Sequence, residues 1–312
     1  MSGTAPTRIA YLGPEGTFAE QALRTLPVAA TAALQPMPGV PEAIEAVRSG
    51  DADAALVPLE NSVEGAVPVT LDELASGEPL VITREVHLPV TFGLYGRPGT
   101  ELTSVKTVAS HPHGLAQCRG WVRRTLPDAE MVPTLSTSEG AAAVARGDHD
   151  AALCAALAGE RQGLTALATN VGDNPDAVTR FVLLTRPGPP AERTGHDVTS
   201  LVAYISHDRT GALLEVLTEF AVRGINLTRI ESRPTKERLG RYCFFLDCSG
   251  HVADARVGEA LMGLRRICAD VRFLGSYPRD DDPGSVASRP GTADEDFAAA
   301  AAWLHRVRQG AW

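Results

Sequence analysis

The sequence has few cysteines and no pair of them spaced as in a metal-binding motif. The five cysteines, an odd number with no CxxC pair, are Cys118, Cys154, Cys243, Cys248 and Cys268. Such a set indicates neither a disulfide framework nor a zinc site. No complete cofactor motif is present either. We therefore expect a protein of the reducing cytoplasm that works without a cofactor and without a metal.

Basic charge and long apolar runs are also scarce. The chain has 29 Lys and Arg residues against 38 Asp and Glu residues, a net charge of −9, and no basic run. This balance argues against a surface that tracks a nucleic-acid backbone. No apolar run is long enough to span a membrane, and the start MSGTAPTRIAYLG lacks the segments of a secretory signal. We expect a cytoplasmic protein with no nucleic-acid or membrane partner.

What is present is a chain of 312 residues with globular composition and an internal repeat. The segment GDADAAL at 50–56 matches GDHDAAL at 147–153 in six of seven positions, with an offset of 97 residues. A short helical pattern ends at the glycine of each copy, and an apolar strand follows. The repeat predicts two halves with the same order of strands and helices.

Strands alternate with helical segments through both halves, which predicts two α/β lobes with mostly parallel sheets. Lobe 1 is expected at about 8–85 plus 180–185, and lobe 2 at about 90–178. In open α/β sheets, ligands bind beyond the carboxyl ends of the strands, where helix amino termini offer unpaired N–H groups. We therefore expect the ligand between the lobes.

Polar residues follow several of the predicted strands. Glu60, Asn61 and Ser62 come directly after the apolar strand AALVPL. Their position at the carboxyl end of a strand predicts contact with a ligand, although the start of a solvated turn has the same pattern. Thr179, Arg180 and Phe181 stand at the start of a strand, FVLLT, that returns to the first lobe. Such a crossing between lobes is typical of a hinge.

Three further segments join a strand to a helix. They are GPEGTF at 13–18 with Gly16 and Thr17, SHPHGLAQC at 110–118 with Ser110 and Gln117, and STSEGAAAVA at 136–145 with Ser136 and Thr137. Glycine and hydroxyl residues there suit an anionic ligand, but plain helix capping explains them equally well. A metal held by His111 and His113 is disfavoured because no third ligand is visible at a suitable spacing.

The pattern changes after a Pro- and Gly-rich linker at 186–197. Residues 198–277 predict the order βαββαβ, an α+β ferredoxin-like arrangement. Residues 278–312 are expected to be a flexible connector and a short C-terminal helix, with acids at the start of the helix and arginines near its end.

Together these motifs, in this order, resemble the prephenate dehydratase family. The resemblance covers residues 8 to about 277 and includes GPEGTF, VPLENSVEGAV, SHPHGLAQC and TRF. It implies a bilobal catalytic unit at 8–185, similar to periplasmic binding proteins, followed by an ACT regulatory domain. His113 stands where the family usually has Gln, and PDAV precedes Thr179 where an Asn-rich stretch is common.

The resemblance also implies roles for individual residues. The catalytic groups would be Thr179, Glu60, Asn61, Ser110, Gln117 and Arg180, and the substrate-binding groups Gly16, Thr17, Ser62, Ser136, Thr137 and Phe181. The effector phenylalanine would bind at Gly211, Ala212, Leu213, Asn226, Leu227, Glu231, Ser232 and Arg233. The reaction would turn prephenate into phenylpyruvate, CO₂ and water in phenylalanine biosynthesis.

Several alternatives stay open at this point. The substrate can be arogenate instead of prephenate, or the lobes can form a sensor without catalysis. The proton donor can be Thr179 or Glu60; an ionised Glu60 beside a substrate carboxylate would be repelled by a few kcal/mol, so it is either protonated or faces a donor elsewhere. The ACT domain predicts a homodimer or homotetramer, and dimerisation alone is the alternative to regulation by phenylalanine.

Overall fold

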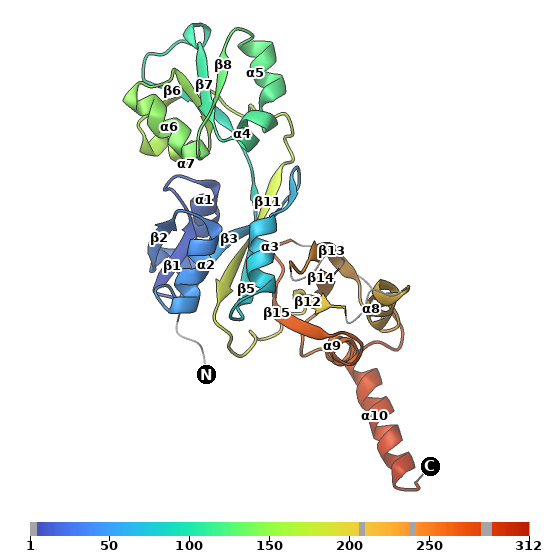
Figure 1. Cartoon of the computed structure of the whole chain (residues 1–312). Helices are drawn as coiled ribbons and strands as arrows, with labels where there is room; N and C mark the ends of the chain where they lie inside the picture. Colours follow the sequence, from blue (N-terminus) through green and yellow to red (C-terminus); the bar gives the residue numbers. More distant parts are fainter. Residues whose placement is uncertain (1–4, 206–209, 237–240, 282–288, 312) are drawn as a thin grey trace. The chain divides into compact units, whose positions relative to one another are not determined.

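The computed structural model describes residues 5–205, 210–236, 241–281 and 289–311, and it divides the chain into two compact units (Figure 1). Unit 1 comprises Met1–Thr70 and Val86–Leu183, and unit 2 comprises Leu71–Glu85 and Leu184–Trp312. Residues 282–288 of the predicted connector lie outside the described residues. None of the helices in the described ranges has the length and apolar character needed to cross a bilayer.

The first lobe is built on a sheet with the strand order β2-β1-β3-β11-β5, and β4 pairs with the end of β3. β1 pairs in parallel with both β2 and β3. The strands are β1 (Arg8–Leu12), β2 (Ala33–Met37), β3 (Ala54–Asn61), β4 (Gly65–Ala66), β5 (Val81–Pro89) and β11 (Val178–Thr185). The helical segments are α1 (Phe18–Thr25), η1 (Pro27–Ala30), α2 (Val40–Ser49) and α3 (Pro68–Ala75).

The second lobe has a sheet with the order β10-β6-β9-β7-β8. β7 pairs in parallel with β8 and β9, whereas β6 is antiparallel to both of its neighbours. The strands are β6 (Gly93–Gly96), β7 (Thr107–Ser110), β8 (Glu130–Pro133), β9 (Ala151–Cys154) and β10 (Thr165–Ala168). The helical segments are η2 (Leu102–Ser104), α4 (Pro112–Gln117), α5 (Arg119–Thr125), α6 (Thr137–Arg146) and α7 (Ala156–Arg161).

The sequence repeat corresponds to a repeated structural unit. α2 and α6 start at residues 40 and 137 and end at 49 and 146, and β3 and β9 start at 54 and 151, so all three boundaries differ by 97. Gly50 and Gly147 end the two helices in the left-handed conformation, with φ angles of 87° and 91°. Only glycine adopts this conformation without steric cost, which explains the repeated glycine.

The repeated aspartates secure the start of the neighbouring strand in each lobe. The Asp53 carboxylate accepts hydrogen bonds from the Thr7 N–H at 2.9 Å and the Thr7 hydroxyl at 2.8 Å. Asp150 accepts the same pair of bonds from Thr107, at 3.0 Å and 3.1 Å. Hydrogen bonds from Thr7 lower the pKa of Asp53 to about 2. The GD(A/H)D motif is therefore part of the fold of each lobe.

Burial along β3 explains why an apolar strand ends in polar residues. Ala54, Ala55, Leu56 and Val57 are fully buried, whereas Glu60 and Asn61 are half-buried. The buried part packs in the lobe 1 core with Ile9, Tyr11, Leu23 and Phe181. The strand therefore carries its last two side chains beyond the core.

The C-terminal module has the predicted order βαββαβ. Its sheet has the strand order β13-β14-β12-β15, and each of these neighbouring pairs is antiparallel. The elements are β12 (Asp197–Tyr204), α8 (Ala212–Ala221), β13 (Leu227–Pro234), β14 (Tyr242–Ser249), α9 (Ala255–Ile267) and β15 (Asp270–Pro278), followed by α10 (Asp294–Arg308). The ferredoxin-like ACT arrangement is confirmed.

The end of α3 and the turn after it contact this module within unit 2. The Arg233 guanidinium bonds to the Asp72 carboxylate at 3.0 Å and 3.2 Å, and the Lys236 ammonium reaches the same carboxylate at 2.7 Å. The Arg272 guanidinium donates to the carbonyls of Leu74, Ser76 and Gly77. α3 is therefore held by side chains of the ACT domain.

Candidate active site

The closest link among the predicted site residues joins Asn61 to Thr179. The Asn61 amide Nδ2 donates a hydrogen bond of 2.7 Å to the Thr179 hydroxyl oxygen. Asn61 is the last residue of β3 and Thr179 the second residue of β11, and these strands are neighbours in the sheet. The sheet therefore brings together two side chains that are 118 residues apart in the chain.

A tight turn fixes the orientation of the Asn61 amide. Its Oδ1 accepts hydrogen bonds from the N–H groups of Val63 at 2.8 Å and Glu64 at 3.1 Å. With the oxygen occupied in this way, the NH₂ group faces Thr179. Because Thr179 accepts from Asn61, its own hydroxyl proton is available to another acceptor. Thr179 is 8% exposed, so this donor sits in a largely desolvated position.

The neighbouring residues hold this pair in place. The Ser62 N–H donates to the Val178 carbonyl at 2.9 Å, and the Val178 N–H donates back to the Ser62 hydroxyl at 2.9 Å. The Phe181 ring is buried in the lobe 1 core, where it anchors β11. Phe181 is 3% exposed, and its expected contact with substrate stays a prediction. Glu60 and Arg180 lie half-buried beside the pair.

A second group of predicted residues converges in lobe 2. Ser110 ends β7, is fully buried, and donates its hydroxyl to the Leu153 carbonyl at 2.6 Å. A Cβ atom on Gly114 would lie 2.6 Å from the Ser110 Oγ and 3.4 Å from the Thr137 Cγ2. Ser110 and Thr137 therefore flank the same glycine, at the amino ends of α4 and α6.

Gln117 is the last residue of α4 and is half-buried. Its carbonyl accepts a 2.7 Å hydrogen bond from the Asp173 N–H, while the Asp173 carboxylate accepts from the N–H groups of Gly120 and Trp121. These bonds tie the segment that leads into β11 to the start of α5. They fix the backbone of Gln117 in lobe 2.

Two predicted binding residues serve as helix caps. The Thr17 hydroxyl caps α1 by accepting from the Glu20 N–H, and it donates to the Leu12 carbonyl at 2.9 Å. The Ser136 hydroxyl caps α6 by accepting from the Glu139 N–H at 2.9 Å. The capping interpretation of these two hydroxyls thus matches the geometry.

Sequence reasoning missed a charged cluster that joins the two lobes within unit 1. Arg161 at the end of α7 forms ion pairs with Glu15 and with the buried Glu20, and Glu20 also accepts from the Gly16 N–H at 2.7 Å and the Arg24 guanidinium at 2.7 Å. Burial, with Glu20 and Glu15 nearby, raises the pKa of Tyr11 to about 12. No local pattern pointed to Arg161, because its partners are 141 and 146 residues away.

The lobes approach each other closely beside this cluster. A Cβ atom on Gly16 would lie 3.0 Å from the Ala158 Cα and 3.4 Å from the Ser138 Oγ. The rings of Phe18 and Phe92 meet edge to face, with centroids 5.2 Å apart. Glycine at position 16 is therefore required by contact between lobes.

The predicted effector residues lie on α8 and β13. Gly211 caps α8, Ala212 and Leu213 form its first turn, and Leu227 begins β13. Glu231 and Ser232 lie farther along β13, Asn226 precedes the strand, and Arg233 is engaged by Asp72. Residues 206–209, just before Gly211, are outside the described part.

The histidine pair has a structural role. His111 caps α4, since its Nδ1 accepts a 3.2 Å hydrogen bond from the His113 N–H. Burial, and secondarily His113, lowers the pKa of His111. Within the described ranges, no group of three His, Cys, Asp or Glu side chains has the geometry to hold a metal ion.

Comparison with known proteins gives two family matches. Residues 9–189 match the family model described as prephenate dehydratase, and residues 200–266 match the ACT domain model. A prephenate dehydratase from Amycolatopsis methanolica is 51% identical over 305 residues, covering 97% of this chain and 99% of the relative.

Two solved structures are similar to this chain over most of its length. The prephenate dehydratase from Arthrobacter aurescens in complex with L-Phe is 49% identical, with a TM-score of 0.92 and coverage of 97% of this chain and 99% of that one. A protein named GqqA, described as a quorum quenching acylase, is 29% identical, with a TM-score of 0.79 and coverage of 88% and 98%.

Proposed function

Because this chain belongs to the prephenate dehydratase family of hydro-lyases, we propose that it converts prephenate into phenylpyruvate, in the formation of phenylalanine. The observation that carries the proposal is the Asn61–Thr179 hydrogen bond, which leaves a desolvated hydroxyl proton free for a leaving group. The substrate would lie between the lobes, with Thr179 on one side and the Ser110–Thr137 group on the other.

The reaction requires little covalent chemistry from the protein. The prephenate dianion takes up one proton, its ring carboxylate leaves as CO₂, and its ring hydroxyl leaves as water, so phenylpyruvate remains as a monoanion. The electron pair of the breaking C–C bond enters the ring, which becomes aromatic as the C–O bond breaks. The protein must therefore orient the dianion and supply a proton or a strong hydrogen bond at the hydroxyl.

Thr179 would donate a hydrogen bond to the departing hydroxyl, and Asn61 would hold the Thr179 oxygen in position. A threonine hydroxyl is too weak an acid to protonate the hydroxyl unaided, so Arg180 or a protonated Glu60 would support the transfer. The amide groups at the starts of α4 and α6, beside Ser110 and Thr137, would receive a substrate carboxylate. Gln117 would add a further polar contact.

The direct test is to incubate the purified full chain with prephenate and, separately, with arogenate. We expect release of phenylpyruvate from prephenate, measured by absorbance and by chromatography. Formation of phenylalanine from arogenate at a higher kcat/KM would favour the second candidate substrate, which differs by an amino group in place of the keto group. Absence of product from both would contradict the proposed reaction and leave a binding function.

The acylase named among the similar structures does not suggest a better assignment. A serine nucleophile needs a base to take its proton. Ser110, the buried serine of the proposed site, donates its proton to the Leu153 carbonyl instead.

We also propose that phenylalanine regulates the enzyme through the ACT domain. The support is the L-Phe complex of the Arthrobacter aurescens relative, which covers this chain almost completely. Gly211, Ala212 and Leu213 at the start of α8 would receive the carboxylate of the effector, because the first N–H groups of a helix have no partner within the helix. Asn226, Leu227, Glu231 and Ser232 would complete the site.

Assembly through the ACT domain is part of the same proposal. β13 is an edge strand of the sheet, and its residues alternate between half-buried and exposed. An open edge of this kind can pair with another copy, which gives a homodimer or homotetramer. The free cysteines fit the reducing cytoplasm as the site of action.

A further inference from the structure

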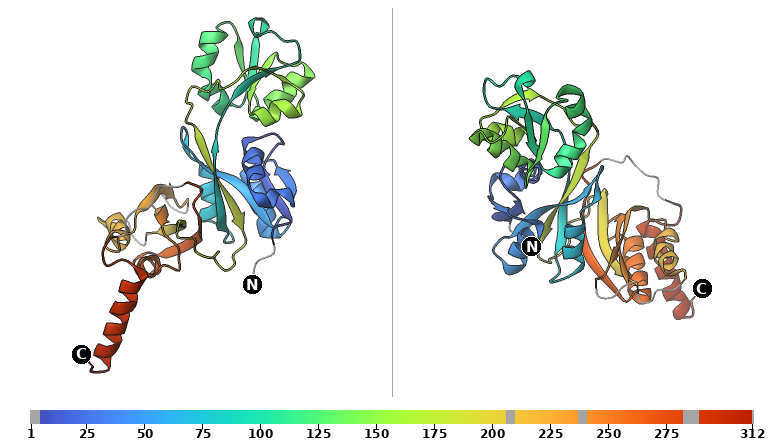
Figure 2. Two further views of the ribbon diagram at one scale, coloured as in Figure 1. Left: turned by 180° about the vertical axis from the view of Figure 1, so that it is seen from behind. Right: turned by 45° about the horizontal axis from the view of Figure 1, so that its top comes forward.

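The C-terminal helix α10 exposes an apolar face that the enzymatic function does not use. Figures 1 and 2 show α10 extending from the end of the ACT domain that carries α9, away from the sheet. None of its 15 residues is buried, and Trp303 and Leu304 are 57% and 41% exposed. At 100° per residue, the half-buried Phe297 and Val307 share one side of the helix with the exposed Leu304, and Trp303 lies at its margin. Clustered large apolar side chains on a surface usually mark an interaction site.

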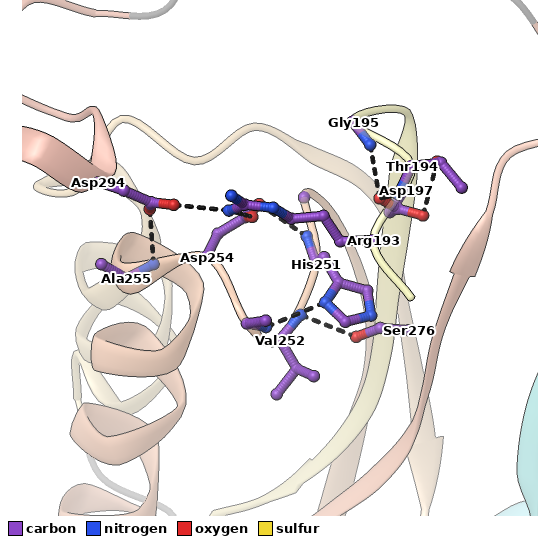
Figure 3. A network of polar contacts seen from close by, with 12 residues as sticks. Arg193, Thr194, Gly195, Asp197, His251, Val252, Asp254, Ala255, Ser276 and Asp294 are labelled. Carbon is purple, nitrogen blue, oxygen red and sulfur yellow. Dashed lines mark hydrogen bonds and ion pairs between the residues drawn. The ribbon is translucent and has the colours of Figure 1, made fainter. Parts of the chain in front are cut away.

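The base of this helix is fixed by a polar network (Figure 3). The Asp294 carboxylate accepts from the Ala255 N–H at 2.9 Å and from the Arg193 guanidinium at 2.6 Å. Arg193 also bonds to Asp254 at 3.0 Å. The bond from Arg193, followed by that from Ala255, lowers the pKa of Asp294. α10 is therefore presented at a defined position next to α9.

The charges of α10 are arranged so that two copies of the helix can attract each other when they run in opposite directions. Its first turn carries Asp294, Glu295 and Asp296, and its last turn carries His305, Arg306 and Arg308. Residues 298–302 between them are all alanine. A second α10 in the same direction would place like charges together. A second α10 in the opposite direction would place acids against arginines at both ends.

We propose that α10 is an assembly face that pairs, antiparallel, with α10 of a second copy of this chain. With the two-fold axis at Ala301, Arg308, which lies on the same side of the helix as Phe297, is level with Asp294 of the other copy, and Phe297 lies beside its Leu304. The alanines let the helices approach closely at the crossing point. A helix of 15 residues is about 22 Å long, so the pair buries less than a standard interface. Pairing of α10 therefore adds one concentration-dependent association step to the assembly through the ACT domain.

The first test compares two full-length variants that place the same charge on opposite sides of α10. Leu304→Glu charges the apolar face, and the matched control Ala302→Glu charges the far face. Sedimentation equilibrium over a range of micromolar concentrations measures the dissociation constant of each association step. We expect Leu304→Glu to raise one dissociation constant at least tenfold and Ala302→Glu to change it less than twofold. Equal constants for the two variants would overturn the proposal.

Charge reversal tests the direction of the pair. A variant with Arg306→Glu and Arg308→Glu has an acidic helix, and one with Glu295→Lys and Asp296→Lys has a basic helix. Each alone is expected to lose the association step, and an equimolar mixture is expected to recover it. A mixture that stays dissociated contradicts antiparallel pairing.

Cross-linking tests contact without disturbing charge. Ala300→Cys lies on the apolar face near the axis, and Ala302→Cys on the far face. A short bis-maleimide should link two copies of Ala300→Cys at least fivefold more than Ala302→Cys or the unaltered chain, whose own cysteines give the background. Equal yields from both variants would overturn the contact.

Discussion

At the scale of single residues, the direction of one hydrogen bond decides what the site can do. Asn61 donates to Thr179 because its oxygen is already bound by the N–H groups of Val63 and Glu64. If the direction were reversed, the Thr179 hydroxyl would donate its hydrogen bond to Asn61 and could not donate to the substrate. The turn after β3 thus leaves the proton of the Thr179 hydroxyl available, as the proposed donation to the substrate requires.

We expect Asn61→Asp to lower kcat at least a hundredfold. The aspartate keeps an oxygen for the turn, but it presents an acceptor to Thr179 and adds a negative charge near a dianionic substrate. At 4 Å and an effective dielectric of 20, that repulsion is about 4 kcal/mol. Steady-state kinetics with prephenate measure the effect.

The matched control is Asn170→Asp, which adds the same charge at an exposed turn of lobe 2. It should retain kcat within about twofold. An equal loss in both variants would mean that net charge, and not the bond to Thr179, is responsible.

The positions of candidate site residues were predictable only where the residues belong to a contiguous motif. Asn61 and Thr179 stand in short segments, ENS and TRF, whose resemblance to a family pointed to them. Phe181 is in the same segment and shares a face of β11 with Thr179, but it lies further from the start of the strand, where its ring packs in the lobe 1 core. The Glu20–Arg161 pair was not predictable, because a long-range ion pair leaves no periodic signal in the sequence.

At the scale of helices and strands, the duplicated GD(A/H)D motif forms the connection between a helix and the strand that follows it. Glycine ends the helix and aspartate ties the next strand to its neighbour, in both lobes. The sequence revealed the duplication directly, because turn chemistry restricts these positions to few residue types. The antiparallel placement of β6 was not predictable, since alternation of strands and helices alone does not give strand direction.

We expect Asp53→Asn to lower the free energy of unfolding at pH 7 by about 1 to 2 kcal/mol. The carboxylate has a folded-state pKa of about 2 against 3.8 for a free side chain, and its partial exposure reduces the stabilisation this shift implies. A lowered pKa stabilises the fold above pH 4, and this contribution is lost as the pH falls toward 2. The difference between wild type and variant should therefore shrink over that interval.

Urea denaturation at a series of pH values provides the measurement. Asp128→Asn, at an exposed position, is the control and should change stability by less than about 0.5 kcal/mol. A pH-independent difference for Asp53→Asn would show that the carboxylate charge is not what stabilises the turn.

The contact between α3 and the ACT domain leads to a prediction about regulation. Asp72 on α3 is bound by Arg233 of β13, and α3 follows β3 and β4, which carry Asn61 and its turn. We expect Asp72→Asn to reduce the effect of phenylalanine on activity at least threefold while basal kcat stays within twofold of wild type. Kinetics with and without phenylalanine measure both quantities. An unchanged effect of phenylalanine in this variant would show that the Asp72–Arg233 contact takes no part in regulation.

At the scale of the whole molecule, a bilobal catalytic unit and an ACT module belong to one chain, as in the relatives that it matches almost end to end. The fold class was predictable because the hydrophobic periodicity of each segment indicates a helix or a strand, and the segments follow one another in a recognisable order. The grouping of 71–85 with the C-terminal unit was not, because it depends on contacts of Arg233 and Arg272 that no pattern reports.

Phenylalanine should stabilise the folded chain if the ACT domain binds it. At a hundredfold excess over its dissociation constant, a ligand that binds only the folded state contributes about 2.7 kcal/mol. We expect a rise in the Tm of the unfolding transition that grows with the logarithm of the phenylalanine concentration. Ser232→Asp, which puts a charge at the proposed effector site, should abolish the rise. Leucine at the same concentrations serves as the ligand control.

The most direct measurement of the central claim is kcat for Thr179→Val beside Thr179→Ser, at saturating prephenate. Valine keeps the shape of the side chain and removes the hydroxyl that Asn61 positions, while serine keeps the hydroxyl. We predict that the valine variant loses at least a thousandfold, about 4 kcal/mol of transition-state stabilisation, and that the serine variant stays within about tenfold. A valine variant as active as the serine variant would contradict the account.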